Sequence, residues 1–100
     1  MFTYTTPSIT CTLKKVDFTN VDYVRVAVKS SNESIVREIP VSDIDTVNGV
    51  VVVTLTQQET AALGAGQIGI QARIHYEDGS VQPTNKIFKK MEDALDKVVI

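Results

Sequence analysis

The feature that most constrains the fold of this chain is a strict alternation of apolar and other residues from position 67 to position 76. One set of alternate positions is apolar and comprises Ile68, Ile70, Ala72, Ile74 and Tyr76. The other set is polar or small and comprises Gln67, Gly69, Gln71, Arg73 and His75. A period of two places these sets on opposite faces of a β-strand. The segment therefore predicts a strand with one face in a core and the other in solvent.

Residues 50–55 predict a second, interior strand, because they are almost entirely β-branched. β-Branched side chains have a restricted χ1 angle and favour a sheet over a helix. Between the two strands, Thr56 and Glu59 have the spacing of a capping box, in which each side chain bonds the backbone N–H of the other residue. Gly64 then supplies the left-handed conformation that commonly ends a helix. These signals predict a short crossover helix near residues 57–63.

Two dipeptides that favour tight hairpins flank this central unit. Asn48 with Gly49 suits the positive φ angles of a two-residue type I′ turn, and Asp78 with Gly79 repeats the device. Two-residue loops fix the register of the strands on either side. The first turn then pairs Val47 with Val50 and Ile44 with Val53. The second pairs Tyr76 with Val81 and Ile70 with Ile87, and both of these pairs fall on the core face.

The same alternation predicts strands earlier in the chain, in residues 8–14 and 23–29. Their inward positions are Ile9, Cys11, Leu13, Val24, Val26 and Val28. Polar residues 30–33 predict a turn into a third strand, residues 34–39. Pro40 interrupts or ends that strand, because proline cannot donate to the ladder.

The two ends of the chain carry weaker patterns. Phe2 and Tyr4 alternate with threonines before Pro7, which favours a short edge strand or a lead-in. Near the other end we expect a strand to about Met91 and a helical turn from Glu92. The second expectation rests on the three-and-four spacing of Phe88, Met91, Leu95 and Val98.

A chain of 100 residues has the length of one domain, so we expect residues 1–100 to share one core. Hydrophobic residues make up 43% of the sequence, with no Trp, so the interior must consist mainly of Val, Ile and Leu. The predicted fold class is all-β: an immunoglobulin-like antiparallel β-sandwich of about seven strands. The crossover helix near residues 57–63 then connects the two sheets.

The sequence offers little that points to catalysis or to a bound cofactor. A lone His75, expected on the exposed face of its strand, and a lone Cys11, expected in the core, cannot make a zinc site. The acidic residues lack the spacing of a calcium loop. We therefore predict no metal, no cofactor, no small-molecule substrate and no enzymatic activity. A hydrolase that uses His75 is the third alternative.

Charge and hydropathy exclude further classes of partner. The net charge is −2, and the Lys and Arg residues are scattered along the sequence, so nucleic acid and anionic membranes are not expected as partners. No segment approaches the ~20 apolar residues of a membrane span. The N-terminus lacks the basic and apolar regions of a signal peptide, which predicts a protein made in the cytosol.

Some apolar groups are not securely buried by the predicted register. These candidate partner contacts are Tyr4, Phe88, Val98, Val99 and Ile100. Exposed apolar groups and open sheet edges commonly mark sites of association. The alternative is that these residues cap the open ends of the sandwich.

Four segments together resemble a group of small proteins from phages and prophages of Gram-positive bacteria. They are residues 2–7 (Phe-Thr-Tyr-Thr-Thr-Pro), 9–13 (Ile-Thr-Cys-Thr-Leu), 55–60 (Leu-Thr-Gln-Gln-Glu-Thr), and 71–73 (Gln-Ala-Arg) leading to Asp78 and Gly79. The chain is similar to the N-terminal β-sandwich module of phage baseplate upper proteins, which docks a receptor-binding assembly onto the tail. The resemblance implies a part of a virion or tail.

We therefore expect a non-enzymatic structural or assembly protein of a phage or prophage tail or baseplate. Its partners would be other tail or baseplate proteins, or further copies of itself in a homo-oligomer or ring. It would lie in the host cytoplasm before assembly and in the virion afterwards. The alternative is a monomeric immunoglobulin-like binding module or small inhibitor of a host protein, with residues 17–22 and 30–33 carrying the binding.

Overall fold

The computed structural model describes residues 2–13, 16–84 and 86–92, and these fold mainly into strands. The seven strands are β1 (Ser8–Thr12), β2 (Val21–Lys29), β3 (Ser34–Pro40), β4 (Val50–Thr54), β5 (Gly66–Tyr76), β6 (Val81–Pro83) and β7 (Ile87–Met91). One helix, α1 (Gln57–Leu63), and two 3₁₀ turns, η1 (Phe18–Asn20) and η2 (Val41–Asp43), complete the described elements.

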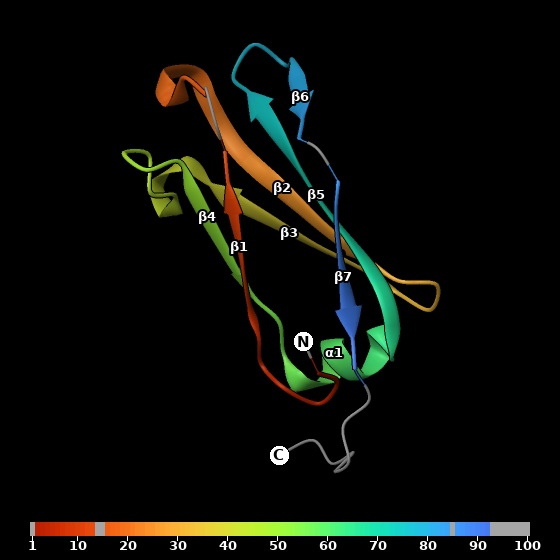
Figure 1. Cartoon of the computed structure of the whole chain (residues 1–100). Coiled ribbons are helices and arrows are strands. Elements are labelled where there is room, and N and C mark those ends of the chain that lie inside the picture. The colour runs from red at the N-terminus through yellow and green to blue at the C-terminus, as the bar shows by residue number, and fades with distance from the viewer. Residues whose placement is uncertain (1, 14–15, 85, 93–100) are drawn as a thin grey trace.

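The strands form two antiparallel sheets (Figure 1). One sheet consists of β1 and β4 alone. The other has the order β3-β2-β5-β6, and β7 pairs with a different part of β5. The predicted all-β class, the seven strands and the antiparallel pairing are confirmed.

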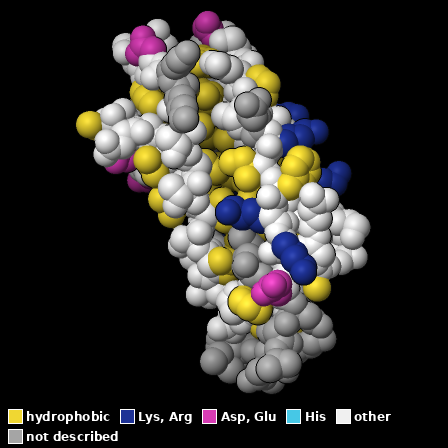
Figure 2. Space-filling model, in the orientation of Figure 1, with side chains coloured by type: hydrophobic (Ala, Val, Ile, Leu, Met, Phe, Trp, Pro, Cys, Tyr) yellow, Lys and Arg dark blue, Asp and Glu magenta, His cyan; other side chains and the backbone are white. Residues whose placement is uncertain are grey.

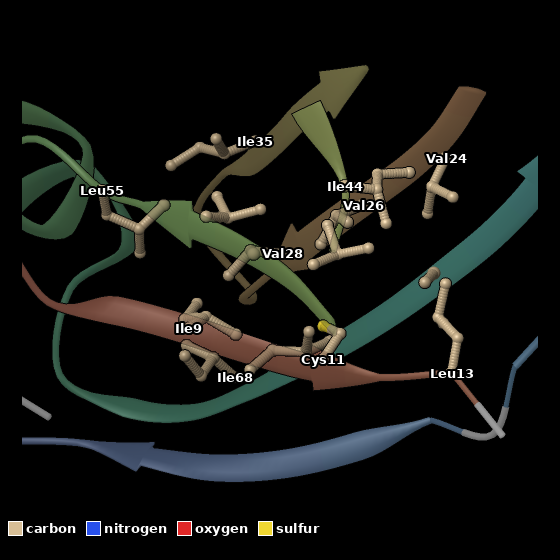
Figure 3. Close-up of a cluster of buried hydrophobic side chains, with 14 of the residues drawn as sticks. Ile9, Cys11, Leu13, Val24, Val26, Val28, Ile35, Ile44, Leu55 and Ile68 are labelled. Carbon is tan, nitrogen blue, oxygen red and sulfur yellow. The ribbon is translucent and has the colours of Figure 1, made fainter. Parts of the chain in front are cut away.

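The hydrophobic core lies between the two sheets, where side chains from β1 and β4 meet those from β2 and β5 (Figure 3). The inward positions predicted for residues 8–14, 23–29 and 67–74 are buried, and Val24 and Ile68 are 0% exposed. Cys11 is part of this core, as predicted. Alternation along these three strands therefore identified the core-facing residues correctly.

The helix α1 begins and ends where the sequence predicts. Thr56 Oγ1 accepts the N–H of Glu59 at 3.1 Å, and the Glu59 carboxylate accepts the N–H of Thr56 at 2.9 Å. Gly64 ends the helix with φ of +72°. On the inner side, buried Thr60 accepts the N–H of Thr5 at 3.2 Å and donates to its carbonyl oxygen at 3.0 Å. The helix therefore holds the N-terminal segment in place.

The turn at Asn48 and Gly49 differs from the prediction. Asp45, and not Val47, pairs with Val50, through backbone hydrogen bonds of 3.0 and 3.2 Å. The Asp45 carboxylate also accepts the N–H groups of Val47 at 3.2 Å and Asn48 at 3.1 Å. Because this Asx-type arrangement stabilises a longer loop, the predicted pair of Val47 with Val50 is wrong. Val47 is 92% exposed.

The partner of β4 also differs from the prediction. Val53 lies opposite Ile9 of β1, and not opposite Ile44. Ile44 follows η2 and is buried in the core. Gly49 extends the pairing of β1 with β4 by one residue pair, because its carbonyl oxygen accepts the N–H of Leu13 at 2.7 Å. Its φ is +68°, and a Cβ there would lie 2.5 Å from the Leu13 carbonyl oxygen, so this close approach requires glycine.

The hairpin predicted at positions 78 and 79 is present, but its loop has three residues. Tyr76 N–H donates to the Ser80 carbonyl oxygen at 3.0 Å, and Gly79 N–H donates to the Tyr76 carbonyl oxygen at 3.0 Å. Gly79 has φ of +90°, as expected for a three-residue loop that ends in a bulge. The extra residue shifts the register by one. Val81 therefore lies opposite His75 on the outer face, and the predicted pair with Tyr76 is wrong.

The register returns to the predicted one in β7, where Ile70 lies opposite Ile87. The change occurs between β6 and β7, near Thr84, whose N–H donates to the Ala72 carbonyl oxygen at 2.9 Å. Ile87 shares the core side of the sheet with Ile70, yet Ile87 is 46% exposed and Ile70 only 2%. The sheet that would cover Ile87 has two strands, whereas its own sheet has five.

Both ends of the described chain meet beside the end of β7. The strand ends at Met91, as predicted, and Met91 is buried. Glu92 forms a parallel bridge with Phe2, and its carbonyl oxygen accepts the N–H of Thr3 at 2.8 Å. Tyr4 then turns the chain with φ of +56°. The rest of the predicted C-terminal helical turn, residues 93–100, lies outside the described residues.

Candidate protein-binding face

The outer face of the five-stranded sheet, opposite the core, carries five basic side chains. We call it the basic face and define it by Arg25, Lys29, Arg73, Lys86, Lys90, Glu38 and Phe88. Alternation along β2, β5 and β7 brings these residues together, since their neighbours in sequence point into the core. Figure 2 views the molecule from the side of β1, β4 and β7, and Lys and Arg side chains are visible there at the right-hand side and centre.

The basic face has the opposite charge to the rest of the chain. Arg25 lies opposite Arg73 on one side and Glu38 on the other, with 3.2 Å between Arg25 Nη1 and Glu38 Oε1. Five cations and one carboxylate give the face a formal charge of +4. The whole chain carries −2, so the remainder carries −6. The cations are scattered in the sequence but gathered by the fold, and this segregation favours an acidic partner.

Phe88 gives the basic face an exposed apolar centre. It lies opposite Gly69 of β5, and a Cβ on Gly69 would come within 3.4 Å of the Phe88 ring. The missing side chain therefore lets the ring lie across the strand. Phe88 is nevertheless 59% exposed. Beside it is a hollow of about 490 Å³, which Lys29, Gln71 and Arg73 also line.

An aromatic stack lies further along the same face. The rings of Tyr23 and His75 are 4.4 Å apart at their centroids and 10° from parallel. His75 was expected to be an exposed surface residue, but it is half-buried and its Nε2 is buried without a hydrogen bond. The register explains the difference, because Val81 and Tyr23 lie on either side of it in the sheet.

The structure separates the candidate contacts predicted from the sequence. Phe88 lies on the basic face, whereas Tyr4 is half-buried in the turn that precedes β1. Val98, Val99 and Ile100 lie outside the described residues. Sequence reasoning missed the cations around Phe88. Arg25 and Arg73 both occupy polar positions of alternating segments, which placed each of them on an outer face. That they lie opposite each other could be known only from the strand order.

The carboxylates of Asp17, Asp45 and Asp78 accept hydrogen bonds that stabilise their own turns. Hydrogen bonds from Thr19 lower the pKa of Asp17, those from Asn48 lower the pKa of Asp45, and those from Ser80 lower the pKa of Asp78. Burial raises the pKa of the Cys11 thiol. Within residues 2–13, 16–84 and 86–92, no group of three or more His, Cys, Asp or Glu is placed to hold a metal ion.

In the described part of the chain, no helix is both long and apolar enough to cross a membrane. Comparison of the chain with protein families, with curated proteins and with solved structures finds no match.

Proposed function

We propose that this chain is a non-enzymatic structural or assembly protein of a phage or prophage tail or baseplate, which docks an acidic protein surface on its basic face. One observation carries the docking role: a chain of net charge −2 presents five cations around an exposed Phe88 on one sheet face. Exposed aromatic residues surrounded by polar residues, and Arg in particular, are typical of protein interfaces.

The strand order supports the immunoglobulin-like part of the proposal. In such sandwiches, strands B and E belong to one sheet and strands C, F and G to the other, with C′ added beside C in variable-type domains. The pairing of β1 with β4 corresponds to B with E. The order β3-β2-β5 corresponds to C′-C-F, and β6 and β7, which both pair with β5, take the place of G. The outer face of that second sheet is the basic face.

The tail assignment rests on the resemblance to baseplate upper proteins. The segments that carry it lie in β1, at the start of α1, and in β5 with the hairpin that follows. Partners in a tail would be other tail or baseplate proteins, or further copies of this chain. The proposed location is the host cytoplasm before assembly and the virion afterwards.

A binding experiment with matched variants tests the docking role. The purified chain is titrated with each tail and baseplate protein encoded in the same genome. Arg73→Glu with Lys86→Glu should weaken binding by about tenfold or more, because two positive charges of the basic face become negative and repel an acidic partner. Phe88→Ala should weaken it further, whereas Val47→Ala, at an exposed valine outside the basic face, should leave it unchanged.

Higher salt should weaken the wild-type interaction, since the contact is electrostatic. The proposal fails if no tail protein binds, or if binding is equal in all variants. It also fails if the basic face binds single-stranded nucleic acid in preference to every tail protein.

For the alternative, a monomeric binding module, only one of its two expected binding loops, residues 17–22, lies beside a hollow that could take a partner. The two loops expected to carry its binding, residues 17–22 and 30–33, lie at opposite ends of the nine-residue strand β2, about 30 Å apart. Ser30 Oγ and Asn32 Nδ2 both bond the Leu63 carbonyl oxygen, at 2.8 and 3.2 Å, so the second loop is held against α1. Near the first loop, Asp17 and Glu77 line an acidic hollow of about 810 Å³, which would accept a basic partner.

A further inference from the structure

The hollow on the basic face is lined by cations that have no acidic partner in the described part of the chain. Lys29, Arg73 and Lys86 line it, whereas no Asp or Glu does. The ion pairs between described residues involve Arg25 and Arg37 instead. The hollow therefore presents three positive charges that a carboxylate from outside can neutralise.

Small residues give this hollow its depth. Gly69 of β5 has no side chain, and Ala27 of β2, which lies opposite Gln71, has only a methyl group. Phe88 lies on the other side of Gly69 and is 59% exposed. The space of about 490 Å³ thus offers an apolar wall as well as positive charge.

The hairpin between β5 and β6 has the complementary properties and projects from the upper end of the sheet in Figure 1. Residues 77–83 are all exposed, and a Cβ added to Gly79 would meet no atom within 4 Å. Glu77 and Asp78 form its acidic tip. Val81, which is 46% exposed, follows on the outer face.

Further carboxylates surround this hairpin. The N–H of Glu77 donates to the carbonyl oxygen of Asn20 at 2.9 Å, which ties the hairpin to the loop that carries Asp17 and Asp22. Asp17, Glu77 and Asp78 line one hollow, and no described Lys or Arg lines it. The negative charge outside the basic face is therefore partly concentrated at this end of the molecule.

We propose that the hollow of the basic face receives the β5–β6 hairpin of a second copy of this chain. Glu77 and Asp78 of the second copy would lie among the cations of the hollow, and its Val81 would pack against Phe88. The inference rests on the docking role proposed above and names the partner as another copy, because one chain carries both complementary surfaces.

The hairpin cannot fill the hollow of its own copy. Glu77 follows Gly69 by eight residues, and both lie on or directly after the continuous strand β5. An extended strand rises about 3.4 Å per residue, so the two positions are about 27 Å apart. The bond between Tyr76 N–H and the Ser80 carbonyl oxygen holds the hairpin in line with the strand. The contact can therefore form only between copies.

This contact joins two different surfaces. Each copy has one hollow and one hairpin, so a bound copy still presents the surface that the next copy needs. Such head-to-tail contacts build a ring where the rotation between copies closes, and an open chain where it does not.

Charge variants of the full-length chain test the proposal, with the mass in solution measured by light scattering. The wild type should exceed the mass of one chain as its concentration rises, and added salt should reduce that mass. The face variant, Arg73→Glu with Lys86→Glu, should weaken self-association by about tenfold or more. The hairpin variant, Glu77→Lys with Asp78→Asn, should do the same.

Asn at position 78 keeps an oxygen that can accept the bonds from Ser80, so the turn is retained. Two controls reverse charges elsewhere. Asp43→Lys, on η2, and Lys89→Glu, on the core side of β7, should leave the mass equal to that of the wild type.

Mixing the two variants gives the sharpest result. The face variant keeps an intact hairpin and the hairpin variant keeps an intact hollow, so an equimolar mixture should associate although neither variant does so alone. Restored association also shows that both variants are folded.

The proposal is overturned if the wild type keeps the mass of one chain at every concentration. It is overturned equally if the hairpin variant associates like the wild type, or if the mixture fails to associate. None of these results affects docking of a tail protein, because the hairpin variant retains the basic face. If the variants behave as expected and no tail protein binds, self-association stands and the proposed tail docking fails.

Discussion

Ile70 and Ile87 lie side by side on the same face of one sheet, yet Ile70 is 2% exposed and Ile87 is 46% exposed. Both follow the same alternation, and both were predicted to face the core. The difference lies in the opposite sheet, because β1 and β4 cover the centre of the five-stranded sheet but leave β6 and β7 open. Within residues 2–13, 16–84 and 86–92, one half of the five-stranded sheet is therefore covered by the other sheet, and the other half presents apolar groups beside an edge of β1 with which no described strand pairs.

The largest expected difference between these halves is in stability. Ile68→Ala, in the closed half, should lower the free energy of unfolding by about 3 kcal/mol, because it leaves a cavity in a fully packed site. Ile87→Ala, in the open half, should lower it by about 1 kcal/mol or less, since the side chain already contacts water. Urea denaturation measures both values. Equal losses would show that Ile87 is covered.

Gly49 and Gly79 allow a second comparison, between a glycine in close contact with β1 and a glycine in an open turn. Gly49→Ala should cost about 3 kcal/mol, because a Cβ at φ of +68° would also lie 2.5 Å from the Leu13 carbonyl oxygen. Gly79→Ala should cost about 1 kcal/mol, because φ is +90° but no atom lies within 4 Å of the added Cβ. Thermal and urea unfolding of both variants provide the test. A larger loss for Gly79→Ala would contradict the described approach of β1 to Gly49.

A smaller effect is expected where α1 holds the N-terminal segment in place. Thr60→Val preserves shape but leaves the N–H and C=O groups of Thr5 without the bonds that Thr60 supplies. It should lower the free energy of unfolding by about 2 kcal/mol. Thr54→Val, at an exposed threonine of β4, should change it by less than about 0.5 kcal/mol. Similar losses in the two variants would mean that the Thr60 bonds contribute nothing.

The smallest expected effect concerns pH. The hydrogen bond from Arg37 is the main cause that lowers the pKa of Glu59 from its ordinary value of 4.5, and the backbone bond from Thr56 adds to it. Folding therefore favours the ionised carboxylate, so its contribution is present above pH 4.5 and is lost as the pH falls through the lowered pKa. Because Arg37 is partly exposed, the contribution should be about 0.5 kcal/mol or less.

Glu59→Gln and Arg37→Gln should each flatten the dependence of unfolding free energy on pH below 4.5. Stability curves at several acidic pH values, compared with the wild type, measure the slope. An unchanged slope in both variants would exclude the ion pair as its source.

The sequence predicted the closed half of the molecule better than the open half. Alternation identified Ile9, Val24 and Ile68 as core residues, and the spacing of Thr56 and Glu59 located α1, because these signals are local. The errors occurred at Asn48 and Gly79, where a side-chain bond or one extra loop residue changed the register. Such differences are small in energy and depend on the strands that flank the turn.

The candidate site was predicted only in part for a related reason. Phe88 was identified because its apolar side chain did not fit the buried register. Arg25 and Arg73 were not identified, since they are distant in sequence and become neighbours only when β2 pairs with β5. The edge of β1 with which no described strand pairs could not be inferred either, because it depends on which strands pair with β1.

Residue-resolved hydrogen exchange tests the difference between the two halves most directly. At a protein concentration low enough for the monomer, the amides of Thr10 and Thr12 should exchange rapidly, whereas those of Cys11 and Leu13 should be protected by β4. Equal protection of all four amides in the monomer would contradict the open edge on which the account depends.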